Sequence, residues 1–195
     1  MKGDFSRVTF DPANSFSRVL MQQGRVSIDA DSVEQTDILL HYLRTLATDI
    51  IGPYGAPSGG AGGFQISADK EGGLSISAGR YYVDGILVEN AQPCLYTTQP
   101  YYPLMANDPI KVLLEDGESD EGYWVYLDVW ERLITSIEDD SIREKALGGP
   151  DTSARTKVIW QVKAVSLDEI LGAGGLAAAK KTAAKATKAG LIPEK

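Results

Sequence analysis

Apolar residues recur at helical spacing between residues 32 and 51. The main stripe advances in steps of four, three and four, and four further positions widen it: Leu39, Leu43, Leu46 and Ile50, then Ile38, Tyr42, Ala47 and Ile51. This spacing is typical of a helix that buries one broad face. The pattern predicts a long amphipathic helix that packs this stripe on the core.

Both ends of this helix have sequence signals. Ser32 can cap the first turn while Gln35 reaches back to it, and Asp31 with Glu34 offers the same capping box one residue earlier. At the other end, the Gly-Pro pair at 52–53 allows a positive φ angle and then prevents continuation of the helix. We therefore expect a helix from about residue 32 to residue 51.

Short alternating runs of apolar and polar residues predict strands on both sides of the helix. Residues 26–28 predict a short half-buried strand, and residues 64–66 and 74–76 predict two more. In residues 80–89, RYYVDGILVE, the Asp-Gly pair supplies the two positive-φ positions of a tight hairpin turn. This segment is expected to form a hairpin whose large side chains belong to a core or to a contact surface.

Six glycines and two prolines fill residues 52–63, which predicts a flexible surface loop. The order of helix, loop and strand is the reverse of that in a phosphate-binding loop. We therefore do not expect a phosphate site here.

Residues 123–135, YWVYLDVWERLIT, are apolar on both faces of an expected strand. Such a strand is either buried on both sides or packed in the core on one side and against a partner on the other. Residues 156–167 predict a second strand that pairs with it. Residues 136–149 predict a short helix between the two strands, with a glycine as its stop.

These elements place the chain in the α+β class, mainly β. We expect antiparallel sheets with one long N-terminal amphipathic helix and one short helix. Residues 1–24 have no sustained period and predict an irregular interaction arm, with a turn at the Asp-Pro pair 11–12. Residues 25–170 are expected to form a single α+β domain, and residues 171–195 a flexible Ala/Lys-rich tail.

Charge separates the body from the tail. The 195 residues carry a net charge of −8, and residues 172–195 hold five lysines and one glutamate, or +4, so residues 1–171 carry −12. A body this acidic lacks the clustered Lys and Arg that bind phosphates, so nucleic acid is not an expected partner. The tail is either a solvated tether or a basic arm that docks on an acidic neighbour. No apolar stretch approaches the ~20 residues needed for a membrane helix, so membrane insertion is not expected.

Reactive side chains are few. His41 is the only histidine and lies in the amphipathic helix, so a helix-surface role is expected. Cys94 is the only cysteine and predicts a small buried thiol. Asp128, in the middle of an apolar strand, is expected to be satisfied by a neighbouring Arg or a backbone amide. We therefore assign no catalytic residue, no metal ligand and no cofactor.

Two loop segments offer further candidates. Tyr101 and Tyr102 stand together among prolines and predict local packing under the loop or a partner-binding anchor. Five acidic residues within 115–121 lack the spacing of a calcium-binding loop, which favours a solvated acidic turn.

Long blocks of the sequence resemble an uncharacterised bacterial domain family. They are MKGDFSRVTFDPANSFSRVLMQQGRVSIDAD with the following EQ, GRYYVDGILVEN, VYLDVWER and IREKALGGPDTSARTKVIWQVK. The sequence departs from the family pattern at Ser32 and Val33, where Trp and Asn are more frequent. Members occur beside genes of phage-tail-like contractile injection systems. The resemblance implies a structural part of such a machine and carries no catalytic motif.

We therefore expect a non-enzymatic structural subunit, associated with the baseplate or lining the particle, that is assembled in the cytoplasm. Its expected partners are other baseplate, tube or sheath proteins and further copies of itself. The particle would stay in the cell, be released, or attach to a membrane. Two alternatives stay open: a carried effector or hydrolase that uses acidic residues near Asp128, and a glycan- or surface-binding module that uses Tyr101, Tyr102 and the tryptophans.

Overall fold

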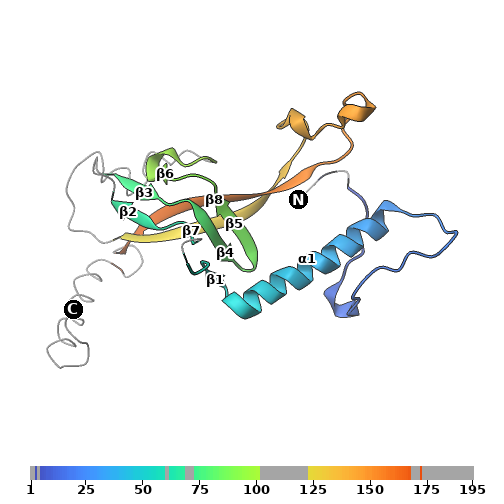
Figure 1. Ribbon diagram of the computed structural model, residues 1–195, viewed down its shortest axis with the longest axis horizontal. Coiled ribbons are helices and arrows are strands. Elements are labelled where there is room, and N and C mark those ends of the chain that lie inside the picture. The colour runs from blue at the N-terminus through green and yellow to red at the C-terminus, as the bar shows by residue number, and fades with distance from the viewer. Residues whose placement is uncertain are drawn as a thin grey trace. The chain divides into compact units, whose positions relative to one another are not determined.

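The structure, a computed structural model, describes residues 3, 5–59, 62–68, 73–101, 123–167 and 172 (Figure 1). The chain divides into two compact units: residues 1–65, 77–92 and 131–159 form unit 1, and residues 66–76, 93–130 and 160–195 form unit 2. One long helix and several short antiparallel strand pairs confirm the α+β, mainly β class. Three predicted features lie outside the described residues: Tyr102, the acidic segment 115–121 and the tail apart from Gly172.

Helix α1 (Asp29–Ile51) is the only long helix among these residues. It begins three residues before the predicted cap, so the assignment of Ser32 as N-cap is wrong. The residue at the cap position is Ile28, and Asp29 and Asp31 lie in the first turn, where carboxylates stabilise the positive end of the helix dipole. The helix ends as predicted, with Gly52 at a φ of 93° and its amide bonded to the Thr48 carbonyl.

The sheet of unit 1 has the order β1-β4-β5. The predicted hairpin is confirmed: β4 (Gly79–Val83) and β5 (Ile86–Asn90) pair antiparallel, with Val83 opposite Ile86. Asp84 and Gly85 both have positive φ angles, of 47° and 75°, as a two-residue hairpin turn requires. Val88 is fully buried in the core of this unit.

The Gly-rich segment after α1 is more ordered than its composition predicts. β1 (Tyr54–Gly55) pairs with β4, so the expectation of a loop throughout residues 52–63 is wrong for this part. Gly63 lies against Gly79 so closely that a methyl group added at Gly63 would be 2.5 Å from the Gly79 carbonyl carbon. Glycine is thus required here because two backbones meet, and not only because a loop needs freedom.

Unit 2 contains the sheet β2-β3-β6, made of β2 (Ile66–Ala68), β3 (Leu74–Ile76) and β6 (Cys94–Leu95). Ile76 and Tyr96 are fully buried, and Tyr96 lies in the 3-10 helix η2 (Tyr96–Thr98). Cys94 is half-buried, less than predicted, because it lies on a two-residue strand at the edge of this sheet.

The two longest strands, β7 (Tyr123–Ile134) and β8 (Arg155–Ser166), form the two-stranded sheet that the sequence predicts, and each contributes residues to both units. Within unit 2, the side-chain amide of Gln99 brackets Val162 of β8. Its oxygen accepts from the Val162 amide at 2.7 Å and its nitrogen donates to the Val162 carbonyl at 2.9 Å. A buried side chain thus takes the place of a neighbouring strand at this point.

The short helix predicted over residues 136–149 is present as two single-turn 3-10 helices, η3 (Asp140–Ile142) and η4 (Lys145–Leu147). Asp139 and Glu144 each accept a backbone amide at the start of one turn and so cap it. Gly148, at a φ of 86°, ends the second turn as predicted.

Candidate interaction surface

Residues 5–28, the arm, run irregularly beside α1 and contain one 3-10 turn, η1 (Pro12–Asn14), capped by Asp11 (Figure 1). The strand predicted over residues 26–28 is wrong. Val26 is 87% exposed and makes no strand pairing, because the chain turns here into the first residue of α1. The irregular character of the arm and its turn at residues 11–12 are confirmed.

Polar contacts attach the arm to the N-terminal half of α1. The hydroxyl groups of Ser6 and Thr9 donate to the carboxylates of Asp29 and Glu34, respectively. The Val19 amide donates to the Gln35 side chain at 3.0 Å. In addition, the rings of Phe10 and His41 are in contact, with their centres 5.5 Å apart. The hydrogen bond from Ser6 is the main cause that lowers the pKa of Asp29 below its usual value. Gln35 therefore binds the arm and does not form the predicted capping box.

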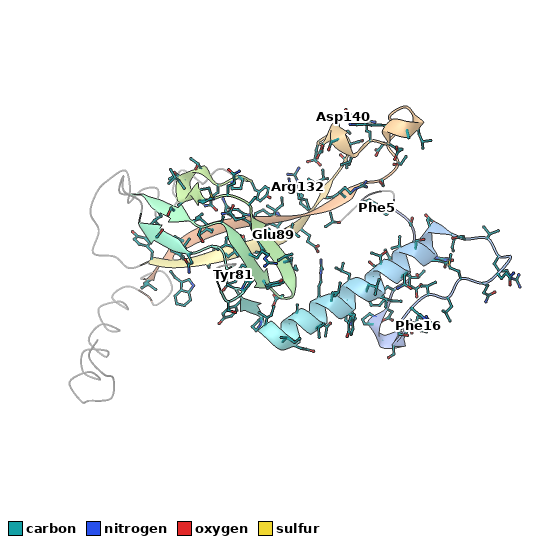
Figure 2. All side chains as sticks on the ribbon, in the orientation of Figure 1. Phe5, Phe16, Tyr81, Glu89, Arg132 and Asp140 are labelled. Carbon is teal, nitrogen blue, oxygen red and sulfur yellow. The ribbon has the colours of Figure 1, made fainter. Side chains whose placement is uncertain are left out.

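This attachment leaves most large apolar side chains of the arm exposed. They are Phe5, Val8, Phe16, Leu20, Met21, Val26 and Ile28. Figure 2 shows Phe5 and Phe16 as separate side chains on the arm. The arm therefore places several apolar side chains in contact with solvent.

Helix α1 also exposes the stripe that the sequence assigns to the core. Its outward side, the α1 apolar face, consists of Leu39, Leu40, Tyr42, Leu43, Leu46 and Ile50. Leu43 is 58% exposed and Ile50 74%, so the prediction that this stripe packs on the chain's own core is wrong. The side of the helix that packs within unit 1 is the one that carries the buried Ile38.

The sheet of unit 1 contacts the C-terminal half of α1 at Arg44 and Ile51, which lie outside the α1 apolar face. The hairpin turn lies so close that a methyl group added at Gly85 would be 2.3 Å from the Arg44 carbonyl oxygen. The Arg44 guanidinium forms two bonds to the Glu131 carboxylate, of 2.6 and 3.3 Å. These contacts fix the rotation of α1 about its own axis and so turn the α1 apolar face away from the sheet.

In unit 2, β7 exposes a second set of aromatic side chains. Trp124 and Tyr126 alternate with the less exposed Val125, as the strand pattern predicts, and Trp124 is 60% exposed. Tyr101 makes an edge contact with Trp160 at 5.7 Å, which confirms local packing for this tyrosine. One face of β7 at residues 123–127 is therefore half-buried, and the other face, which carries Trp124 and Tyr126, is exposed.

Asp128 lies on the same strand and forms an ion pair of 2.5 Å with Lys163 of β8. The Lys163 ammonium also lies 5.8 Å from the centre of the Trp130 ring. The charge that satisfies Asp128 is thus a lysine, where the sequence analysis expected an arginine or a backbone amide. A partly exposed pair of this kind contributes about 0.2–1 kcal/mol and accounts for the position of Asp128 in structural terms.

A family model described as "Family of unknown function" and named DUF6519 matches residues 1–189. The chain belongs to the DUF6519 family. This match confirms the coarser part of the resemblance noted from the sequence, that of a family without an assigned function. No curated protein and no solved structure matches the chain.

Two candidates of this DUF6519 chain remain. His41 is exposed on α1, as predicted, and Tyr102 lies outside the described residues. The part of the chain that the structure describes brings no three His, Cys, Asp or Glu side chains together as a possible metal site. No helix in that part has the length and apolar character needed to cross a membrane.

Sequence reasoning missed the α1 apolar face of the DUF6519 chain as a surface feature. Its signal was present, because Leu40 and Tyr42 stand on either side of the stripe and make it wider than one small sheet can cover. The strand pattern offered only short strands in the first half of the chain as cover for a helix of 23 residues. An apolar helix face that is larger than the predicted strands can cover indicates such a surface.

Proposed function

We propose that this DUF6519 chain is a structural subunit of a phage-tail-like contractile injection system, either associated with the baseplate or lining the particle. It acts through protein-protein contacts with baseplate, tube or sheath proteins and with further copies of itself. It has no catalytic role. The observation that carries this proposal is the large apolar surface that the arm and α1 leave uncovered.

The arm supports an assembly role in a specific way. The arm is held on α1 by polar contacts from Ser6, Thr9 and Val19, while the side chains of Phe5 and Phe16 are exposed. Exposed phenyl rings on a pre-ordered segment suit docking, because the partner gains apolar burial and little chain entropy is lost. The same segment carries much of the resemblance to the family pattern, and that resemblance is the reason for proposing a contractile injection system.

Deletion of the gene followed by electron microscopy of the particles tests the role. We expect missing or malformed particles, restored by the wild-type gene. A double variant, Phe5→Ser with Phe16→Ser, is expected to fold and to leave the assembly defect uncorrected. The matched control is Ile137→Ser, which removes an apolar side chain that is 91% exposed on the turn after β7. Normal, active particles in the deletion strain would exclude the structural role.

One observation favours a second candidate function, that of a glycan- or surface-binding module. Trp124 and Tyr126 project from one face of β7 and are both exposed, and such an aromatic pair can stack on the apolar faces of sugar rings. Binding of the chain to a glycan array, lost in Trp124→Ala and kept in Ile137→Ala, would support this function. Absence of binding at millimolar glycan would exclude it. Nothing comparable favours the effector or hydrolase alternative, because Asp128 is held by Lys163.

A further inference from the structure

The α1 apolar face has the composition and spacing of a helix-helix seam. Leu39, Leu43, Leu46 and Ile50 advance by four, three and four residues, the repeat with which one helix packs along another. No Asp, Glu, Lys or Arg belongs to this stripe, and between residues 39 and 51 the only such residues are Arg44 and Asp49. Arg44 points to Glu131 on the other side of the helix. The face therefore needs an apolar partner of similar length.

We propose that the α1 apolar face binds the same face of a second copy of this chain, with the two helices antiparallel. A two-fold contact requires a surface that is complementary to itself. In the antiparallel register centred between Arg44 and Thr45, Leu43 lies opposite Leu46 of the second copy. Leu39 likewise lies opposite Ile50 of the second copy. Each of these pairs occurs twice, so the whole stripe is used.

The flanks of the face fit the same register. Leu40 lies beside Ala47 of the second copy, so a large side chain meets a small one. Tyr42 lies beside Asp49 of the second copy, where its hydroxyl group can donate to the carboxylate. No two like charges face each other across the seam, because Asp49 of the two copies are separated along the axis by about 13 Å.

A parallel pair would be less favourable for two reasons. It would place the acidic first halves of the helices side by side, each with Asp29, Asp31, Glu34 and Asp37. It would also bring the arm into the seam, because the Val19 amide is bonded to Gln35, one turn before Leu39 on the same face. In the antiparallel register both acidic halves lie beyond the end of the other helix, and so does the attachment of the Val19 amide to Gln35.

The exposed area is sufficient for a specific contact. The six side chains expose on the order of 600 Å² per chain, or about 1,200 Å² for two copies, which is the lower end of the range for stable interfaces. A monomer rarely exposes a single apolar patch larger than a few hundred Å². The inference rests on this face and not on the proposed function, so either can fail without the other.

Sedimentation equilibrium of the full chain, from low to high micromolar concentration, tests the dimer. We expect a monomer-dimer equilibrium, and Leu43→Asp should raise its dissociation constant on the order of 100-fold because both copies place a charge in the seam. Ile137→Asp, the matched control, should leave it unchanged. A monomer at all concentrations, or a dimer that Leu43→Asp does not weaken, would overturn the proposal.

Cysteine cross-linking tests the register in a Cys94→Ser background. A mixture of Leu39→Cys and Ile50→Cys chains should form a disulfide-linked pair, and Leu39→Cys alone should not. The two copies of residue 39 would be about 16 Å apart, well beyond disulfide range. Cross-linking of Leu39→Cys alone would show a parallel pair and overturn the register. A monomer in which Leu43→Cys resists alkylation would show that another part of the same chain covers the face, which would also overturn the proposal.

Discussion

In the β4–β5 hairpin, Val88 is fully buried, whereas four apolar residues of α1 at helical spacing are exposed by two-fifths or more. The two regions belong to the same unit and touch each other at the hairpin turn. The hairpin packs within the chain because its turn fixes which face of each strand points inward. The rotation of α1 is instead fixed by contacts on its less apolar side, so its strongest apolar stripe is left for a partner.

The largest expected effect comes from the contact that joins the two regions. In Gly85→Ala the new methyl group would meet the Arg44 carbonyl oxygen, and an L-residue would have to hold a φ of 75°. We expect a loss of roughly 2–4 kcal/mol in the free energy of unfolding. Urea denaturation followed by circular dichroism measures it.

Gly73→Ala is the matched control, because nothing lies within 4 Å of a methyl group at that position. Its free energy of unfolding should change by less than about 1 kcal/mol. Similar losses in the two variants would mean that the close contact at Gly85 does not orient α1. It would then not explain why the α1 apolar face is exposed while the hairpin is buried.

Truncation of one residue in each region compares the regions directly. Val88→Ala should lower the free energy of unfolding by roughly 1–3 kcal/mol, because it leaves a cavity in a closed core. Leu43→Ala should change it by less than about 0.5 kcal/mol at the lowest usable protein concentration. Equal losses at that concentration would show that Leu43 is buried within the chain.

The sequence predicted those parts of the fold that neighbouring residues determine. The Asp84–Gly85 turn, the end of α1 at Gly52 and the two long strands need no information from elsewhere in the chain. The start of α1 was missed because Gln35 has two possible partners, a cap or the arm, and the arm's Val19 binds it. β1 was missed because two residues among glycines carry no period.

The surfaces were harder to predict for a physical reason. Apolar spacing shows which residues of α1 share a face, but not whether the chain has enough sheet to cover that face. The partner of Asp128 is Lys163, 35 residues further on, and only the pairing of β7 with β8 brings them together. Partners that are distant in the sequence are therefore found only once the strand pairing is known.

A smaller effect is expected at the ion pair between Arg44 and Glu131, which helps to set the rotation of α1. Both side chains are about one-third exposed, so Glu131→Gln should lower the free energy of unfolding by roughly 0.5–1 kcal/mol. A double-mutant cycle with Arg44→Met provides the control, because the second change should cost little once the first is made. Additive losses would show that the pair does not couple α1 to β7.

The smallest expected effect concerns the attachment of the arm to α1. The hydroxyl group of Ser6 donates to Asp29 and lowers the pKa of this carboxyl group. Because the pKa of Asp29 is lower in the folded chain, the contact stabilises arm docking at every pH above the unfolded pKa of about 3.9. This contribution is lost as the pH falls through the folded pKa. The protection factors of the arm amides, which compare their exchange with that of an unfolded chain at the same pH, should therefore fall at pH values below that range, while those of the β4–β5 hairpin stay unchanged. In Ser6→Ala the pKa of Asp29, followed by NMR, should rise towards its usual value. The pKa of Asp139, which Ser141 lowers in the same way, should stay unchanged. An unchanged pKa of Asp29 in Ser6→Ala would show that the arm is held by its other contacts alone. The exposure of the α1 stripe, in contrast to the buried Val88 of the hairpin, would then not depend on this hydrogen bond of the arm.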